Sequence, residues 1–313
     1  MRKSLKIAVL TFAVLSATFF ALLSLGIIWR SPKFYTVKEE KLFKVPIMDM
    51  RAYDTLGDHV RPYLYEIRKG RGAVYVIGIE HTKDINNMQI PIMNATWNTF
   101  QPDVAFVEGR LGFLFEGLQD PVKEYGEGGL TLSLAKEHDI PFYTWEPQKS
   151  DELKMILKQF TPQQAALFYS LRPYFSNFRF GKPADPDASL QELIDSRTDM
   201  DGIRGAITSV AQVDSIWKAD FPKLKDWRDT SDEYGWPDGY LLDIFSLSNQ
   251  IRDVHLCSAV IEAVNEGQKV FVTMGSSHAF RIEKTLRAEL EDQKMNSGFM
   301  SARNTPLLHI SIN

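Results

Sequence analysis

The chain has 313 residues, of which 44% are apolar, 24% charged and 12% aromatic, and its formal net charge is -4. This composition is typical of a globular protein and excludes a disordered, collagen-like or disulfide-scaffold chain. The single cysteine, Cys257, excludes an internal disulfide and a zinc site built from several cysteines. The first 30 residues hold four basic residues and no acid, leaving 32 basic and 40 acidic residues in the remainder. An acidic body without a basic stripe argues against a nucleic-acid partner.

The N-terminus is strongly apolar, because residues 7–29 contain no charge and no proline. A helix of that length is about 34 Å long, which is enough to cross a hydrocarbon core of about 30 Å. Trp29 at its end suits a membrane interface. The sequence therefore predicts a single-pass membrane anchor over residues 1–30. A cleaved signal peptide is the alternative, although its apolar region usually covers only about 7–15 residues, and a buried core helix is a third interpretation.

The side of the membrane on which the body lies is predicted less directly. Basic residues flank the apolar segment on both sides, so their count does not decide the orientation. A basic start followed by a first apolar span resembles a signal-anchor arrangement. We therefore expect the body to lie outside the cytoplasm.

Beyond the anchor, residues 31–71 are expected to form an irregular lead-in to an α/β domain over 72–313. Near-continuous apolar runs are typical of strands buried on both faces of a parallel sheet, and they occur at 73–77, 104–107, 141–145, 270–274 and 306–310. Helical patterns lie between them, at 86–100, 130–138, 151–171, 187–218, 239–266 and 278–292. This alternation predicts a mostly parallel central sheet flanked by helices, with a large and mainly helical insertion at 150–265.

Chemically versatile side chains follow four of these strands. The first and fourth each end in a Gly-x-x-His unit, which places His81 and His278 just past the strand ends. Glu108 follows the second strand and Glu146 follows the third. Each residue alone is also explained as a turn or capping residue, but the recurrence at one topological place favours a site. Because the carboxyl ends of parallel strands share the edge where ligands bind, we expect the four side chains to converge.

Two imidazoles with one or two carboxylates form the mixed nitrogen and oxygen set that suits a divalent transition metal. The predicted ligands are His81, His278, Glu108 and Glu146, and the metal is expected to be of the Mn, Co or Zn class. Such a metal polarises a carbonyl group and acidifies a bound water.

The ordered set of motifs resembles the TraB/GumN family, and the resemblance extends over about residues 72–292. It rests on the two strand-Gly-x-x-His units, on Glu108 after the second strand, and on Arg252 in a late helix. This family includes the Tiki-type proteases and is similar in fold to the erythromycin esterases and the haem-binding ChaN group. One departure is Glu80 inside the first motif, which is closer to the esterase-like branch.

The resemblance implies a hydrolase that acts on a peptide or small-molecule ester. In the mechanism that we expect, His81 and His278 hold a metal or polarise a water, and Glu108 is a further ligand or the general base. Arg252 is expected to stabilise the oxyanion of a tetrahedral intermediate, and Glu80 is the alternative base. A non-catalytic protein that binds haem, a signal peptide or a small ligand in the same cleft is the rival function. The sequence indicates no oligomeric state.

Overall fold

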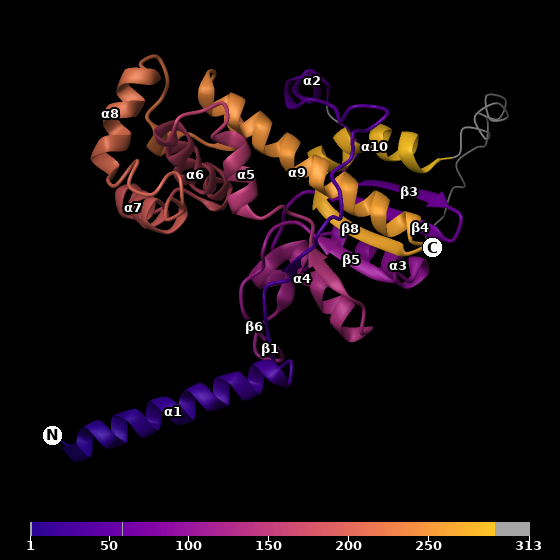
Figure 1. The fold of residues 1–313 in the computed structure, drawn as a ribbon, viewed down its shortest axis with the longest axis horizontal. Coiled ribbons are helices and arrows are strands. Elements are labelled where there is room, and N and C mark those ends of the chain that lie inside the picture. Colours follow the sequence, from indigo (N-terminus) through magenta and orange to yellow (C-terminus); the bar gives the residue numbers. More distant parts are fainter. Residues whose placement is uncertain (1, 58, 292–313) are drawn as a thin grey trace, which may run out of the picture.

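The computed structural model describes residues 2–57 and 59–291. A six-stranded sheet lies between helices, a second group of helices lies beside it, and α1 projects away from both (Figure 1). The strands are β1 (Ile28–Trp29), β2 (Lys33–Phe34), β3 (Tyr63–Lys69), β4 (Gly72–Ile79), β5 (Val104–Val107), β6 (Leu114–Phe115), β7 (Phe142–Thr144) and β8 (Lys269–Gly275). The α-helices are α1 (Arg2–Ser24), α2 (Met50–Asp54), α3 (Gln89–Phe100), α4 (Pro121–Glu137), α5 (Lys149–Ile156), α6 (Pro162–Asn177), α7 (Pro186–Arg197), α8 (Val210–Asp220), α9 (Tyr240–Asn265) and α10 (Ser276–Leu290).

The sheet has the strand order β2-β7-β5-β8-β4-β3, in which only the β3–β4 pair is antiparallel. The prediction of a mostly parallel sheet is therefore confirmed. Four of the five predicted strands correspond to β4, β5, β7 and β8. The fifth, at 306–310, lies outside the described residues.

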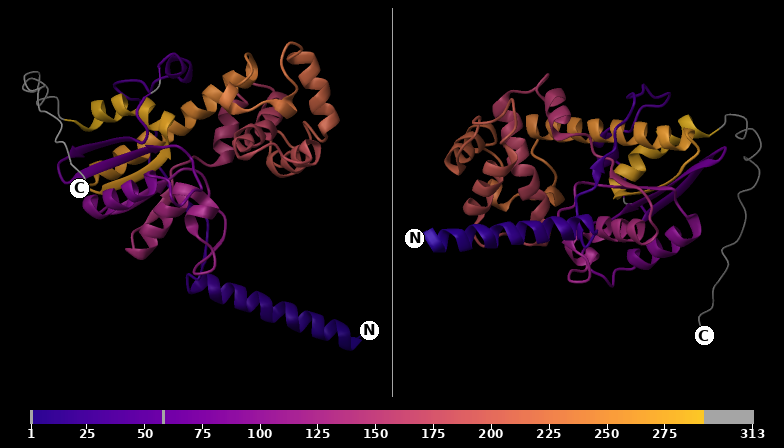
Figure 2. Two further views of the ribbon diagram at one scale, coloured as in Figure 1. Left: turned by 180° about the vertical axis from the view of Figure 1, so that it is seen from behind. Right: turned by 60° about the horizontal axis from the view of Figure 1, so that its bottom comes forward.

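The central strands are buried on both faces, as their continuous apolar runs indicate. Along β8, Val270 and Val272 pack with residues of α9 and α10, whereas Phe271 packs with residues of α3 and α4. The alternation follows from the period of two residues in a strand. Helices therefore cover both faces of the sheet, which makes three layers (Figure 2).

The segment expected to be irregular, residues 31–71, contributes both edge strands of the sheet. β2 pairs with β7 in parallel, and β3 pairs with β4 along its whole length. Tyr65 and Ile67 of β3 are buried, whereas Arg68, on the other face of the strand, is exposed to solvent. This alternating pattern is typical of an antiparallel edge strand with one wet face, and a search for continuous apolar runs does not find it.

Between β7 and β8, the regular elements of the described chain are all helical. They build a hydrophobic core of their own around Phe168, Phe175, Trp217 and Trp227. The helix predicted at 151–171 is two helices, α5 and α6, because Thr161 starts α6 with a capping box and proline follows at its first position. The helix predicted at 187–218 likewise divides into α7 and α8.

α9 joins the two cores. Leu241 and Ile251 in its first half pack in the core of the helical group, whereas Leu256 and Val260 in its second half pack against the sheet. At a rise of about 1.5 Å per residue, its 26 residues extend about 39 Å. One continuous helix therefore fixes the helical group relative to the sheet.

The segment Leu5–Ser24 in α1 has a mean hydropathy of 2.3, and none of it is buried. By length and composition it can cross a membrane, and a signal sequence has the same properties. The helix ends at Ser24, five residues before the end of the apolar segment, because Ile28 and Trp29 form β1 and pair with β6.

Replacing Phe271 by alanine tests the three-layer packing. The side chain is fully buried in the centre of the sheet, so we expect Phe271→Ala to lower the free energy of unfolding by about 3–5 kcal/mol. Chemical denaturation of the detergent-solubilised chain measures the change. Phe180→Ala is the matched control, because Phe180 is exposed. Equal losses in the two variants would contradict the packing described for β8.

Candidate functional site

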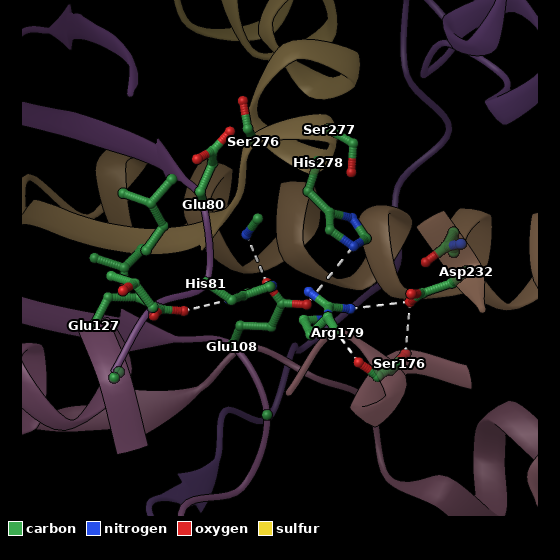
Figure 3. A pocket seen from close by; sticks show the side chains of 18 of the residues that line it. Glu80, His81, Glu108, Glu127, Ser176, Arg179, Asp232, Ser276, Ser277 and His278 are labelled. Carbon is green, nitrogen blue, oxygen red and sulfur yellow. Dashed lines mark hydrogen bonds and ion pairs between the residues drawn. The ribbon is translucent and has the colours of Figure 1, made fainter. Parts of the chain in front are cut away.

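The four predicted strand-end residues lie along one edge of the sheet. The neighbouring strands β7, β5, β8 and β4 carry Glu146, Glu108, His278 and His81 just past their carboxyl ends. All four line one cavity of about 910 Å³, whose opposite wall comes from the helical group. The structure thus brings together the side chains that the sequence places at this edge (Figure 3).

Glu108 lies between the two histidines. Its Oε2 is 3.8 Å from Nε2 of His81, and its Oε1 is 3.8 Å from Nε2 of His278. The backbone N–H of Gly275 donates to Oε2 at 2.7 Å. Burial by itself raises the pKa of Glu108, but His278, His81, Arg252 and this N–H outweigh it and hold the pKa far below its usual range. Glu108 is therefore a permanent negative charge at the centre of the site.

His81 is paired with Glu127 of α4, whose carboxylate lies 2.5 Å from Nδ1. Burial lowers the pKa of His81, but the hydrogen bond that its Nδ1–H donates to Glu127 and the charges of Glu108 and Glu127 outweigh it and raise the pKa to about 9. About a third of the side chain, 36%, is exposed to the cavity. At neutral pH, His81 is therefore an imidazolium whose Nε2–H is directed into the site.

A kink in α4 makes this pair possible. Gly126 has φ +59° and ψ −142° inside the helix. A Cβ atom at this position would lie 2.5 Å from the carbonyl oxygen of Thr82. Only glycine has both the left-handed conformation and the close approach available, so Gly126 allows α4 to bring Glu127 against the residue that precedes Thr82.

His278 has different hydrogen-bond partners from those of His81. Its Nδ1 is hydrogen-bonded to Asp253, which forms an ion pair with the buried Arg281 at 2.8 Å. Its Nε2 is 3.2 Å from Nη1 of Arg252. Because a guanidinium has only donors, Nε2 must accept this hydrogen bond, and Nδ1–H donates to Asp253. Arg252 and Asp253 thus fix the orientation of this ring from its two nitrogens.

Arg252 is buried at the middle of the site and uses all of its donors. Nε and Nη2 donate to Glu146 at 3.0 and 2.6 Å, and Nη2 also donates to Glu108 at 2.8 Å. Nη1 donates to Asn249 at 2.9 Å and to His278. These contacts account for the five N–H groups of a guanidinium. The role predicted for Arg252, stabilising an oxyanion, would require it to release one of these partners.

Glu146 is the partner of Arg252 in the floor of the site. Burial raises its pKa, but the charges of Arg252 and Lys149 and the hydrogen bonds from Arg252 outweigh it and lower the pKa to about 2. Both of its oxygens accept from Arg252. In this arrangement Glu146 is a counter-ion of Arg252 and has no oxygen directed at the histidines.

Glu80 lies at the rim of the cavity. Its side chain is 59% exposed and accepts a hydrogen bond from Arg61 at 2.8 Å. Figure 3 shows its carboxylate pointing away from Glu108. This placement favours a role at the entrance over the role of general base.

The predicted metal donors do not fit a metal ion as they are arranged. Glu108 accepts from Gly275 and Arg252, Glu146 accepts from Arg252, and the Nε2 atom of His278 accepts from Arg252. Among residues 2–57 and 59–291, no group of three or more His, Cys, Asp or Glu side chains is arranged to hold an ion. Metal binding therefore stays a prediction, and no chemical step is derived through it.

The two carboxylates that hold the histidines, Glu127 and Asp253, are not among the residues predicted from the sequence. Both lie on helices, away from the strand ends on which the search was based. The signal for Glu127 is its position inside the glycine-rich run 126–129, which we did not connect with His81. Arg172 and Arg179, which line the opposite wall of the cavity, were also missed.

Comparison of the chain with models of known protein families, with curated proteins and with solved structures finds no match in any of the three.

Replacing Glu127 by glutamine tests the cause of the shifted pKa of His81. Removing the charge and the hydrogen bond that raise this pKa should move it from about 9 toward the ordinary value of 6.5. Titration of the imidazole resonances by NMR measures the shift. Glu124→Gln on the same helix, where Glu124 is exposed, should leave the value unchanged. An unaltered His81 titration in Glu127→Gln would contradict the pairing.

Glu146→Gln tests the buried ion pair through acid stability. A carboxyl whose pKa is lowered in the folded state contributes stability above its unfolded pKa, 4.5, and loses it as the pH falls toward 2. The native chain should therefore lose a few kcal/mol of unfolding free energy over this interval. Glu146→Gln should be less stable at neutral pH and show a shallower acid dependence in denaturation experiments. Glu137 is exposed, so the control variant Glu137→Gln should behave like the native chain. If the ion pair were absent, Glu146→Gln would also behave like the native chain.

Proposed function

We propose that the protein is a hydrolase that cleaves a peptide or small-molecule ester bond in the cleft at the carboxyl edge of the sheet. One observation carries the proposal: two imidazoles, each held by its own carboxylate, face the same glutamate. His81 is protonated at neutral pH, whereas His278 accepts an N–H of Arg252 at Nε2 and donates its Nδ1–H to Asp253.

Hydrolysis needs a base for the attacking water and an acid for the leaving group. In this proposal His278 is the base, and Asp253 fixes its tautomer and stabilises the imidazolium that forms, as the carboxylate of a catalytic triad does. His81 is the acid that protonates the leaving oxygen or nitrogen. Placing two similar groups in different environments is a recognised way to divide these roles.

Glu108 and Arg252 act as positioning residues. The negative charge of Glu108 keeps His81 protonated and lies between both imidazoles. Arg252 holds Glu108 and Glu146 in place from below, and it orients Nε2 of His278. If a water molecule replaced Arg252 as the hydrogen-bond partner of Nε2, His278 would activate this water beside Glu108.

The shape of the cleft supports a small substrate. A cavity of about 910 Å³ is within the range of about 300–1,000 Å³ that is usual for sites that bind small molecules or short peptides. The helical group supplies Arg179 and Phe180 to its wall, and α9 supplies Phe245. These side chains provide one charged and two aromatic contacts for a substrate that lies across the histidines.

The proposed hydrolase agrees with what the resemblance to TraB/GumN proteins implies, with residues 150–265 as a helical insertion into the α/β domain. We further propose that α1 is an uncleaved anchor and that the body lies outside the cytoplasm. A divalent metal of the Mn, Co or Zn class remains the alternative source of an activated water.

His81→Gln and His278→Gln test the acid and base roles in a screen with ester and peptide substrates. Each variant should lose about 10² to 10⁴-fold of the hydrolysis rate, which is the usual contribution of a general acid or base. The native rate should fall as the pH rises through about 9, because His81 then loses its proton. Glu127→Gln should move this fall to lower pH.

His138→Gln is the control, because His138 bonds to the Leu134 carbonyl and lies outside the cavity lining. Full activity in both site variants would contradict the proposal. Turnover that a chelator removes, together with stoichiometric Mn, Co or Zn, would replace the acid–base mechanism with a metal-dependent one. Absence of any turnover together with a Soret band would favour the haem-binding alternative.

A further inference from the structure

Exposed apolar side chains gather where α1 joins the body. Phe113 lies directly before β6, Phe115 lies in it and Leu118 follows it, and their exposed fractions are 56%, 38% and 84%. We call these three residues the apolar tip. Leu25 and Ile27, which follow α1, are also exposed. β1 and β6 pair Ile28 with Phe115, so two segments far apart in the chain lie side by side at the end of α1 (Figure 1).

The apolar tip reaches along α1 into the segment that can span a membrane. The rings of Phe19 and Phe113 meet edge to face, with their centroids 6.0 Å apart. Phe19 lies five residues before Ser24, the end of that segment, which is about 7.5 Å along the helix axis. A single membrane-spanning helix is usually tilted by about 20°. Such a tilt of α1 changes the relative depth of the two rings, which are 6.0 Å apart, by only about 2 Å. If α1 crosses a bilayer, Phe113 therefore lies at the level of the acyl chains.

The backbone of the apolar tip is suited to a medium without water. Tyr125 donates to the carbonyl oxygen of Phe113 at 2.7 Å, and the N–H of Phe115 donates to the side chain of Gln119 at 2.9 Å. The N–H groups of Leu118 and Gln119 both donate to the carbonyl oxygen of Phe115. Polar backbone groups must be satisfied internally to enter hydrocarbon, and these groups are.

Polar contacts fix the tip to the end of α1. Lys136 donates to the carbonyl oxygen of Gly26 at 2.8 Å, and its ammonium lies 4.5 Å from the ring centre of Trp29. The indole N–H of Trp29 donates to Glu116 at 3.0 Å. A tryptophan and a lysine at this level are typical of the interface between water and lipid.

From these observations we propose that the apolar tip is a second membrane contact, which enters the leaflet beside α1 and binds lipid acyl chains. The occupant is the bilayer because the tip lies against the exposed apolar helix α1 through the contact of Phe113 with Phe19. The tip follows Glu108 by only a few residues, and Leu111 between them lines the cavity. The contact therefore holds the cleft at a fixed height near the membrane surface, whatever reaction occurs there.

Single-cysteine labelling of the full chain in phospholipid vesicles tests the proposal. Phe113→Cys and Leu118→Cys carry an environment-sensitive fluorophore, and the vesicles contain lipids with a nitroxide near the headgroup end of one acyl chain. Cys257 is buried, and the native chain treated in the same way gives the labelling blank. We expect both labels to emit at shorter wavelength than in water and to lose most of their emission to the nitroxide.

Two further labels make the outcome decisive. Phe12→Cys, in the middle of α1, should be quenched most strongly by nitroxides near the chain terminus. Leu56→Cys, which is exposed beyond α2 at the opposite end of the body, should not be quenched. Quenching at Phe12 without quenching at Phe113 and Leu118 overturns the proposal. Blue-shifted emission at the tip without quenching also overturns it, because a second protein chain would then cover this surface. If Phe12 is not quenched either, α1 does not insert and the proposal fails with it.

Discussion

The rest of the structure depends on the hydrogen bonds and ion pairs of the buried Arg252 guanidinium. It sits on α9 between the residues that pack into the helical core and those that pack against the sheet. Its contacts join the ends of β5 and β7 to α9 and to α10, through Glu108, Glu146 and His278. A buried charge of this kind is stable only while its partners remain, because removal of one side leaves the other uncompensated. The geometry of the cleft and the packing of the two cores therefore depend on each other.

The two histidines show how the same local sequence acquires different chemistry. Each follows a parallel strand through a Gly-x-x-His unit, and each presents Nε2 to Glu108 at the same distance. They differ in what lies behind and beside them. His81 has two carboxylates beside it, whereas His278 accepts an N–H from Arg252 and is buried. The different surroundings of the two imidazoles thus come from tertiary neighbours.

The strands at 104–107 and 270–274 could be predicted because strands buried on both faces give unbroken apolar runs. The strand-end residues followed from them, since parallel strands share a carboxyl edge. Glu127 and Asp253 could not be predicted in this way, because helix kinks and helix rotation decide where they point, and both are set by packing. Glu127 depends on the backbone conformation of Gly126, and Asp253 depends on the register of α9 against α10. β3 was missed because its period-two pattern differs from that of the central strands.

The position of β8 has a consequence for how the protein forms. This strand enters the middle of the sheet, between β4 and β5, although about 160 residues separate it from β5 along the chain. Until it arrives, β4 and β5 have no common neighbour, and the acids and imidazoles on either side of it cannot meet. Contacts that close such long loops are made late, and they slow folding. We therefore expect the chain to leave the ribosome as a helical group and a hairpin, and to complete its sheet only after most of it has been synthesised.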